Sequence, residues 1–135
     1  MKTRVVHCKK ESYDVYIGRP GKWGNPYSHK DGTLAEFKVK NRSEAIQKFE
    51  EYLLNNEELM SSLHELRGKV LGCWCKKENT YVSCHGDVLA DLCNLMTSLG
   101  VTQISTLVEI YRNRKDDLIK NRKSQGFKYT GESLF

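Results

Sequence analysis

The sequence predicts a small α/β domain with three or four strands, helices packed on the sheet and one further helix at the C-terminal end. Three observations predict this class. The 135 residues contain no internal repeat, which favours one domain. The apolar run Lys69–Cys75 is typical of a buried central strand. Apolar residues then recur at helical spacing between Val88 and Met96, so a helix directly follows that strand.

The N-terminal third predicts short strands separated by a long loop. Arg4–Cys8 and Asp14–Ile17 are rich in β-branched residues, and we expect them to form two strands, as a hairpin with a long connection. Residues 18–33 are rich in glycine and contain both prolines, which predicts an irregular loop. Leu34–Lys40 alternates weakly and predicts a third, edge strand.

The middle of the chain predicts three helices. Asn41 or Ser43 can cap the first, whose buried face would carry Ala45, Ile46, Phe49, Tyr52 and Leu53. A second helix starts at Glu57 and stops at Gly68. The third opens within Ser83–Asp87 and ends at Gly100.

The C-terminal part predicts a basic helix and a tail. We divide the chain into an α/β domain over residues 1–100, a helix over 101–126 packed on it, and a loose tail over 127–135. The net charge is +5, and residues 112–135 contribute +4 of it. A nucleic-acid reader would carry its basic side chains across a folded face. We therefore favour a solvated helix face over non-specific nucleic-acid contact by this helix.

Cysteine content and hydropathy point to a cytoplasmic protein. If a phage encodes it, we expect it in the cytoplasm of the host cell. No apolar run approaches the ~18 residues of a membrane span, and the first ten residues lack the apolar core of a signal peptide. We therefore expect no membrane partner. We also expect the five cysteines to be reduced thiols or metal ligands.

The segment from Tyr16 to Pro26 contains one candidate site. Arg19 and Lys22 are donors suited to phosphate, Trp23 offers a stacking face, and Asn25 can pair with the edge of a base. The structural alternative is a loop in which Trp23 fills the core and Arg19 pairs with a carboxylate. Walker and Rossmann glycine patterns are both absent.

A second candidate site combines Cys73-Trp-Cys75 with Cys84-His-Gly-Asp87. Free N–H groups at the start of a helix bind anions, and Gly86 permits close approach, so His85, Gly86 and Asp87 could contact a polar ligand. The alternatives are a zinc site made of Cys73, Cys75, Cys84 and His85, and small buried thiols with Asp87 as a helix cap. We favour no metal or other cofactor from this spacing.

These segments together resemble a domain-of-unknown-function family that is common in bacteriophages and also occurs in bacteria. The resemblance rests on Tyr13–Pro26, Glu65–Cys75 and Cys84–Ala90, and covers roughly residues 4–95. It implies a small α/β domain, a phage origin and one site shared by both blocks. Onto this chain it carries Arg19, Lys22, Trp23, Gly24, Asn25 and Pro26 from the first block, and Cys73, Trp74, Cys75, Cys84, His85, Gly86 and Asp87 from the second. The loop between Cys75 and Cys84 is longer than the family pattern, and the helix from Thr102 lies outside it.

We expect the two blocks to bind a nucleotide- or nucleoside-like small molecule, with Arg19 and Asp87 facing one cleft. In a phage this would serve nucleotide metabolism, or anti-defence capture of a host signalling nucleotide. A second hypothesis is an enzyme that cleaves a glycosidic or phosphate bond, with His85 and Asp87 as acid and base and Cys84 as a candidate nucleophile. A third is an interaction module that inhibits a host protein through the loop of residues 18–33.

Overall fold

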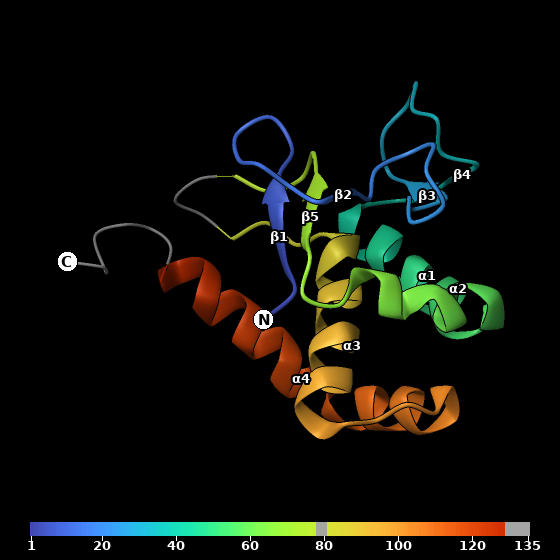
Figure 1. Ribbon diagram of the computed structural model, residues 1–135. Helices are drawn as coiled ribbons and strands as arrows, with labels where there is room; N and C mark the ends of the chain where they lie inside the picture. The colour runs from blue at the N-terminus through green and yellow to red at the C-terminus, as the bar shows by residue number, and fades with distance from the viewer. Residues whose placement is uncertain (78–80, 129–135) are drawn as a thin grey trace.

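The computed structural model describes residues 1–77 and 81–128, and confirms a small α/β domain with a C-terminal helix. Its main sheet has three parallel strands in the order β1-β5-β2 (Figure 1). β5 (Val70–Cys73) is the central, buried strand, as its apolar run predicts, and it pairs with β1 (Arg4–His7) and β2 (Val15–Tyr16). The carboxyl ends of all three strands therefore meet at one edge of the sheet.

The predicted hairpin is wrong, because β1 and β2 lie on opposite sides of β5 and run in the same direction. The connecting residues 8–14 return the chain to the start of the sheet, where the amide of Asp14 donates to the carbonyl of Val70 at 2.8 Å. Seven residues can span ~23 Å, enough for this return past a short strand.

The expected long loop and third strand form a small sheet of their own. β3 (Tyr27–Ser28) pairs in parallel with β4 (Phe37–Lys38), and neither strand joins the main sheet. The rings of Tyr27 and Phe37 stack with centroids 5.1 Å apart, which holds this pair together.

The helices follow the predicted order. α1 (Arg42–Leu54) is capped by Asn41, whose side chain accepts from the amide of Glu44 at 2.8 Å. α2 (Glu57–Ser62) continues as the 3-10 helix η1 (Leu63–Leu66), and Gly68 ends the turn with a φ of 72°.

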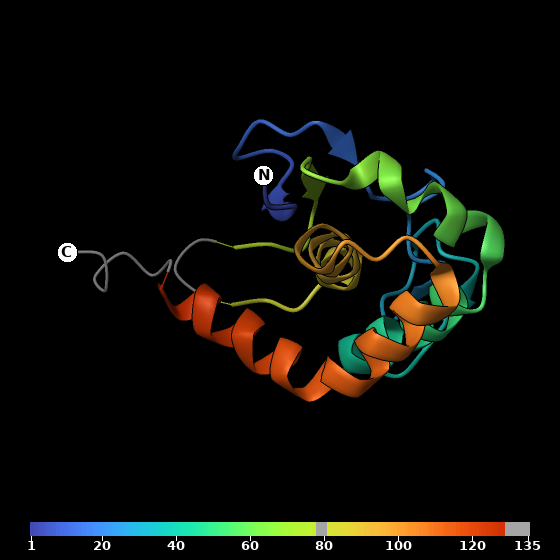
Figure 2. The same cartoon turned by 60° about the horizontal axis from the view of Figure 1, so that its bottom comes forward.

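α3 (His85–Leu99) occupies the centre of the molecule, and the sheet, α1, η1 and α4 surround it (Figure 2). Gly100, with a φ of 65°, ends it as predicted. The core consists of apolar side chains from α1, α2, η1, β5, α3 and the first half of α4. None of the described helices is long and apolar enough to cross a membrane.

The last helix, α4 (Ile104–Lys128), is longer than predicted. Gly126 does not end it, because a single glycine in a helix costs only about 1 kcal/mol relative to alanine. α4 packs on α3 through buried Leu107 and Tyr111. Residues 129–135 of the predicted tail lie outside the described residues.

Candidate functional site

The two sequence blocks meet at His85, the first residue of α3. Its Nε2 lies 2.8 Å from the carbonyl oxygen of Ile17, where the first block leaves β2. Because a carbonyl only accepts hydrogen bonds, Nε2 carries the proton, and Nδ1 of the neutral ring is an acceptor that lies 3.7 Å from the sulfur of Cys84. Gly86 lets α3 approach, since a Cβ there would stand 2.7 Å from the side chain of Ile17. Burial lowers the pKa of His85, which favours this neutral form.

Three cysteines of the second block form a thiol cluster, which we define as Cys73, Cys75 and Cys84. Their sulfur atoms all lie within 4.8 Å of one another, and Cys73 and Cys84 are 3.2 Å apart in the buried interior. Cys73 is the last residue of β5, and Cys75 follows it after the bend at Trp74. None of the five cysteines forms a disulfide. This cluster could hold a metal ion.

The thiols of the cluster influence one another's ionisation. Hydrogen bonding from Cys73, and then from Cys84, lowers the pKa of Cys75 far below its usual value. Hydrogen bonding to Cys75 raises the pKa of Cys73 to about 11, and hydrogen bonding to both neighbours raises that of Cys84 well above normal. A buried thiol with a raised pKa is a poor nucleophile, so these shifts do not favour Cys84 as an activated nucleophile.

The polar residues of the first block bond within their own loop. Arg19 donates from Nη1 to the carbonyl of Asn25 at 2.6 Å and reaches the carbonyl of Tyr27 at 3.4 Å. The buried amide of Asn25 donates to the carbonyl of Ala45 at 3.0 Å and accepts from the amide of Tyr27 at 2.9 Å. These bonds fix the loop to α1.

The other two predicted ligand contacts of this block are also engaged. Trp23 is only 4% exposed and belongs to the core. Lys22 lies over the Trp23 ring and forms an exposed ion pair with Glu65 at 3.0 Å. In this conformation neither side chain is presented to a ligand.

Asp87 caps the start of α3, and its carboxylate is fully used. It accepts from the ammonium of Lys76 at 2.7 Å, from the hydroxyl of Tyr81 at 3.1 Å and from the backbone amide of Cys84 at 3.1 Å. The backbone amide of Gly86 donates to the sulfur of Cys84, and the backbone amide of Asp87 donates to the carbonyl of Cys84. The helix start therefore caps itself, and the amides of Gly86 and Asp87, which we expected to bind an anion, have partners within the protein.

A cleft of about 690 Å³ opens on the other side of this ion pair, between β1, α3 and α4. We call it the β1 cleft. Its charged lining residues are Lys2, Arg4, Lys10, Glu11, Lys76, Lys77, Asp87, Asp91 and Arg122, which give the described lining a formal charge of +3. Asp87 lines it, as expected of a site residue. Arg19 and the rest of the first block do not line this cleft.

The basic side chains of α4 pair largely with acids of the domain. Lys115 contacts the buried carboxylate of Glu50 at 2.6 Å, and Tyr111 donates to the same group at 2.7 Å. Arg122 contacts Asp91 at 2.6 Å and donates to the Tyr111 hydroxyl. These contacts dock α4 onto α1 and α3.

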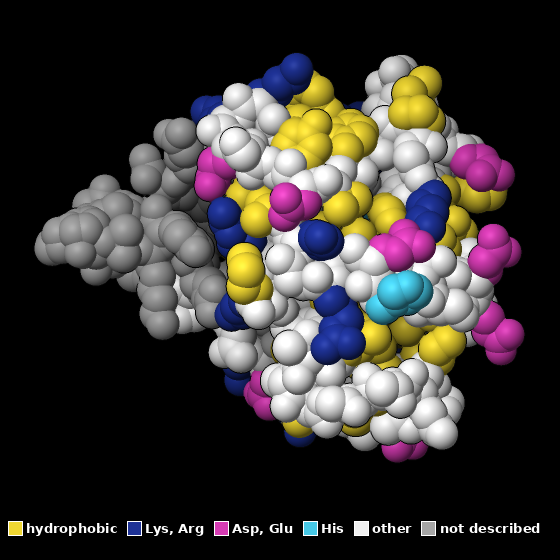
Figure 3. Space-filling view, in the orientation of Figure 1, with side chains coloured by type: hydrophobic (Ala, Val, Ile, Leu, Met, Phe, Trp, Pro, Cys, Tyr) yellow, Lys and Arg dark blue, Asp and Glu magenta, His cyan; other side chains and the backbone are white. Residues whose placement is uncertain are grey.

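An aromatic cluster at the carboxyl edge of the sheet was not predicted. Apolar side chains gather there in the space-filling view, above the end of β5 (Figure 3). Trp74, which is 56% exposed, donates to the hydroxyl of Tyr16 at 2.8 Å and meets His7 edge-on at 5.7 Å. Tyr13 packs beside Tyr16. One signal could have revealed it: His7, Tyr16 and Trp74 each lie at or next to the carboxyl end of a parallel strand, where α/β sheets bind ligands.

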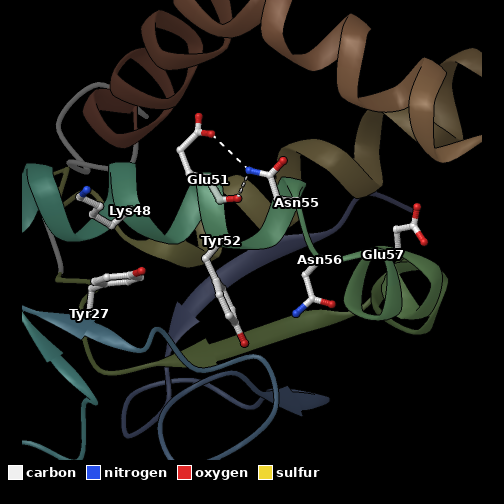
Figure 4. Close-up of a pocket in the computed structure, with 7 residues that line it drawn as sticks. All are labelled: Tyr27, Lys48, Glu51, Tyr52, Asn55, Asn56 and Glu57. Carbon is white, nitrogen blue, oxygen red and sulfur yellow. Dashed lines mark hydrogen bonds between the residues drawn. The ribbon is translucent and has the colours of Figure 1, made fainter.

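A second hollow lies between α1 and β3 and is open to solvent (Figure 4). Tyr27 and Tyr52 stand on its floor, and the amide of Asn55 donates to the carbonyl and carboxylate of Glu51 at its rim. None of the sequence-predicted site residues lines it. Its shallow shape and mixed polar lining favour no particular ligand.

The contributions of Lys76, Tyr81 and Arg122 to the β1 cleft were also missed. The reason is physical. Lys76 and Tyr81 come from a loop and Arg122 comes from a helix far along the chain, and only folding brings them to Asp87 and Asp91. A polar loop and a basic helix contain no spacing that would pair them.

The family described as a domain of unknown function, DUF4326, matches residues 2–95. The chain belongs to this family. An uncharacterised 12.4 kDa protein from the nrdA-td intergenic region of enterobacteria phage T4 is 36% identical over 95 residues, 67% of this chain and 77% of the relative. No solved structure matches the chain significantly. The match ends before α4, so this helix and its ion pairs lie outside the family's shared region.

Proposed function

We propose that the protein binds an anionic, nucleotide-like small molecule in the β1 cleft. The observation that carries this proposal is the charge of the cleft, +3 over its described lining, in a hollow large enough for a small ligand. Phosphate groups are the commonest anions for which such sites are built, and charge-assisted hydrogen bonds to them contribute about 1.5–3 kcal/mol each.

Four of the six cationic side chains of the cleft form two sets. Lys76 and Arg122 are mostly buried and already hold Asp87 and Asp91. Lys2 and Lys77 are exposed, and neither forms an ion pair with any described residue. We assign the phosphate contacts to Lys2 and Lys77, while the buried pairs fix the wall behind them. This replaces Arg19 and Lys22, which bond elsewhere.

A base would find its stacking face on Trp74 in place of Trp23. The Trp74 ring is more than half exposed, and it touches His7, which lines the β1 cleft. Stacking on an exposed aromatic ring is tolerant of base identity. We therefore propose a class of ligand and not one compound: a nucleoside with at least one phosphate.

The relative from phage T4 supports a role during infection. We place the protein in the cytoplasm of the host cell, where it would act in nucleotide metabolism or, as an anti-defence protein, capture a host signalling nucleotide. Catalysis is not part of the proposal, because Cys84 and His85 are buried and the Asp87 carboxylate is fully bonded.

Native mass spectrometry of protein purified from infected or expressing cells tests this function. We expect a complex whose extra mass is that of a phosphorylated nucleoside, and we expect high salt to release it because the contacts are ionic. A stable complex with a host protein, with no small molecule in any preparation, would contradict the proposal and favour an interaction module.

A further inference from the structure

The thiol cluster differs from an ordinary set of buried cysteines. Cys93 shows the ordinary case: it is buried alone in α3 and donates to the carbonyl of Leu63 at 3.6 Å. In the cluster, three sulfurs from the end of β5 and the start of α3 converge within 4.8 Å. Two thiolates on a tetrahedral zinc ion lie ~3.8 Å apart. The sulfurs of the cluster are therefore close enough to bind one shared metal ion.

His85 lies next to the cluster on its Cys84 side, outside the set of donors that all lie within 4.8 Å of one another, and is the nearest candidate for a fourth ligand. Its Nδ1 lies 3.7 Å from the sulfur of Cys84. A sulfur and a nitrogen bound to one tetrahedral zinc ion are separated by about 3.6 Å. The ring is oriented by the hydrogen bond from Nε2 to Ile17, and metal-ligating histidines usually donate their second nitrogen to such a partner.

We propose that Cys73, Cys75, Cys84 and Nδ1 of His85 bind one zinc ion. Three cysteines and one histidine are an established zinc set, and four protein ligands leave no open position for substrate. The site is therefore structural. Cys73 and Cys84 are buried, and half-buried Cys75 leaves a path for the ion to enter.

The position of the zinc site in the fold indicates what the ion would stabilise. It joins the last residues of β5 to the first residues of α3, across the segment that contains Lys76 and Tyr81. Through His85 it also reaches the carbonyl of Ile17 and so the loop of the first block. One ion would thus hold together both blocks, together with the wall of the β1 cleft that Lys76 and Asp87 form.

Metal analysis of the intact protein, purified under reducing conditions without added chelator, is the first test. We expect one zinc per chain by mass spectrometry of the elements. Replacing zinc with Co²⁺ should produce sulfur-to-cobalt charge-transfer bands and visible bands of a tetrahedral ion. Metal-free, reduced protein that shows neither band on titration with Co²⁺ overturns the proposal.

Matched variants locate the ligands. Cys75→Ser and Cys84→Ser should each weaken Co²⁺ binding by at least ~10-fold, which is the lower end of the loss caused by an outer-shell change. Cys93→Ser and Cys8→Ser, which alter thiols outside the cluster, should bind Co²⁺ as the wild type does. Equal losses in all four variants would overturn the assignment.

His85→Gln separates the fourth ligand from the other three. The charge-transfer bands should persist, because three thiolates remain, while the visible bands shift. Unchanged visible bands would overturn the role of His85. The cobalt spectrum of the wild type needs no variant to fold, and no nucleotide is present, so failure here is distinct from failure of the proposed function.

Discussion

The Arg19–Pro26 loop and the β1 cleft both carry several polar and basic side chains, but the two regions use them differently. In the loop, Arg19 and Asn25 bond to backbone carbonyls inside the same segment or to α1. In the cleft, Lys2 and Lys77 face solvent without an ion-pair partner in the described chain. The comparison teaches that the type of a residue shows only that it can form polar contacts. Whether it supports the fold or binds a ligand depends on whether the protein itself already supplies its partner.

The first prediction concerns the buried ion pair that forms the wall of the cleft. Asp87→Asn leaves the ammonium of Lys76 without its carboxylate in a site where the Lys76 side chain is only 18% exposed. We expect a loss of about 3–5 kcal/mol of unfolding free energy, measured by urea denaturation. Asp31→Asn, which alters the exposed pair with Lys38, is the control and should leave the midpoint nearly unchanged. Equal midpoints for both variants would show that Asp87 is not structural.

Arg19→Ala tests the loop side of the comparison. It removes a charged donor from the carbonyl of Asn25, and we expect a loss of about 2 kcal/mol in unfolding free energy. Nucleotide binding to the folded variant should be unchanged, because Arg19 does not line the cleft. Wild-type stability combined with lost binding would reverse the roles that we assign to the two regions.

The free energy of unfolding at alkaline pH tests the role of Tyr81 in the β1 cleft. Burial, together with the charge of Asp87, raises the pKa of Tyr81 above its usual 10.0. Unfolding above pH 10 then releases a proton, so this contribution is present below pH 10 and declines as the pH rises above it. Tyr81→Phe should show a shallower decline between pH 9 and 11 than the wild type. Parallel declines in the two proteins would count against the buried hydroxyl.

The smallest effect belongs to Lys22. Its pair with Glu65 is about half exposed on both sides, and such pairs contribute roughly 0–1 kcal/mol. Lys22→Ala should therefore shift the denaturation midpoint far less than Arg19→Ala. A shift as large as that of Arg19→Ala would mean that the stacking of Lys22 on Trp23 stabilises the loop.

Much of the fold could be predicted because local signals determine it. The apolar run of β5, the cap at Asn41 and the stop at Gly100 each act through neighbouring residues. The hairpin prediction failed because strand pairing depends on the whole sheet, and β5 enters between two strands that are adjacent in sequence. The cleft was missed for the same reason: Arg122 and Asp91 are far apart in the chain.

Calorimetric titration with adenosine and guanosine triphosphates, with inorganic phosphate alongside, tests the central claim most directly. We predict that the wild type binds at least one of the two nucleotides. Lys2→Ala and Lys77→Ala should each weaken binding by about 10- to 100-fold, as expected when one charge-assisted contact is removed. Lys48→Ala, an exposed lysine of α1 outside the cleft, should bind like the wild type. Equal affinity in all three variants, or no binding of either nucleotide by the wild type, would contradict the assignment of the β1 cleft.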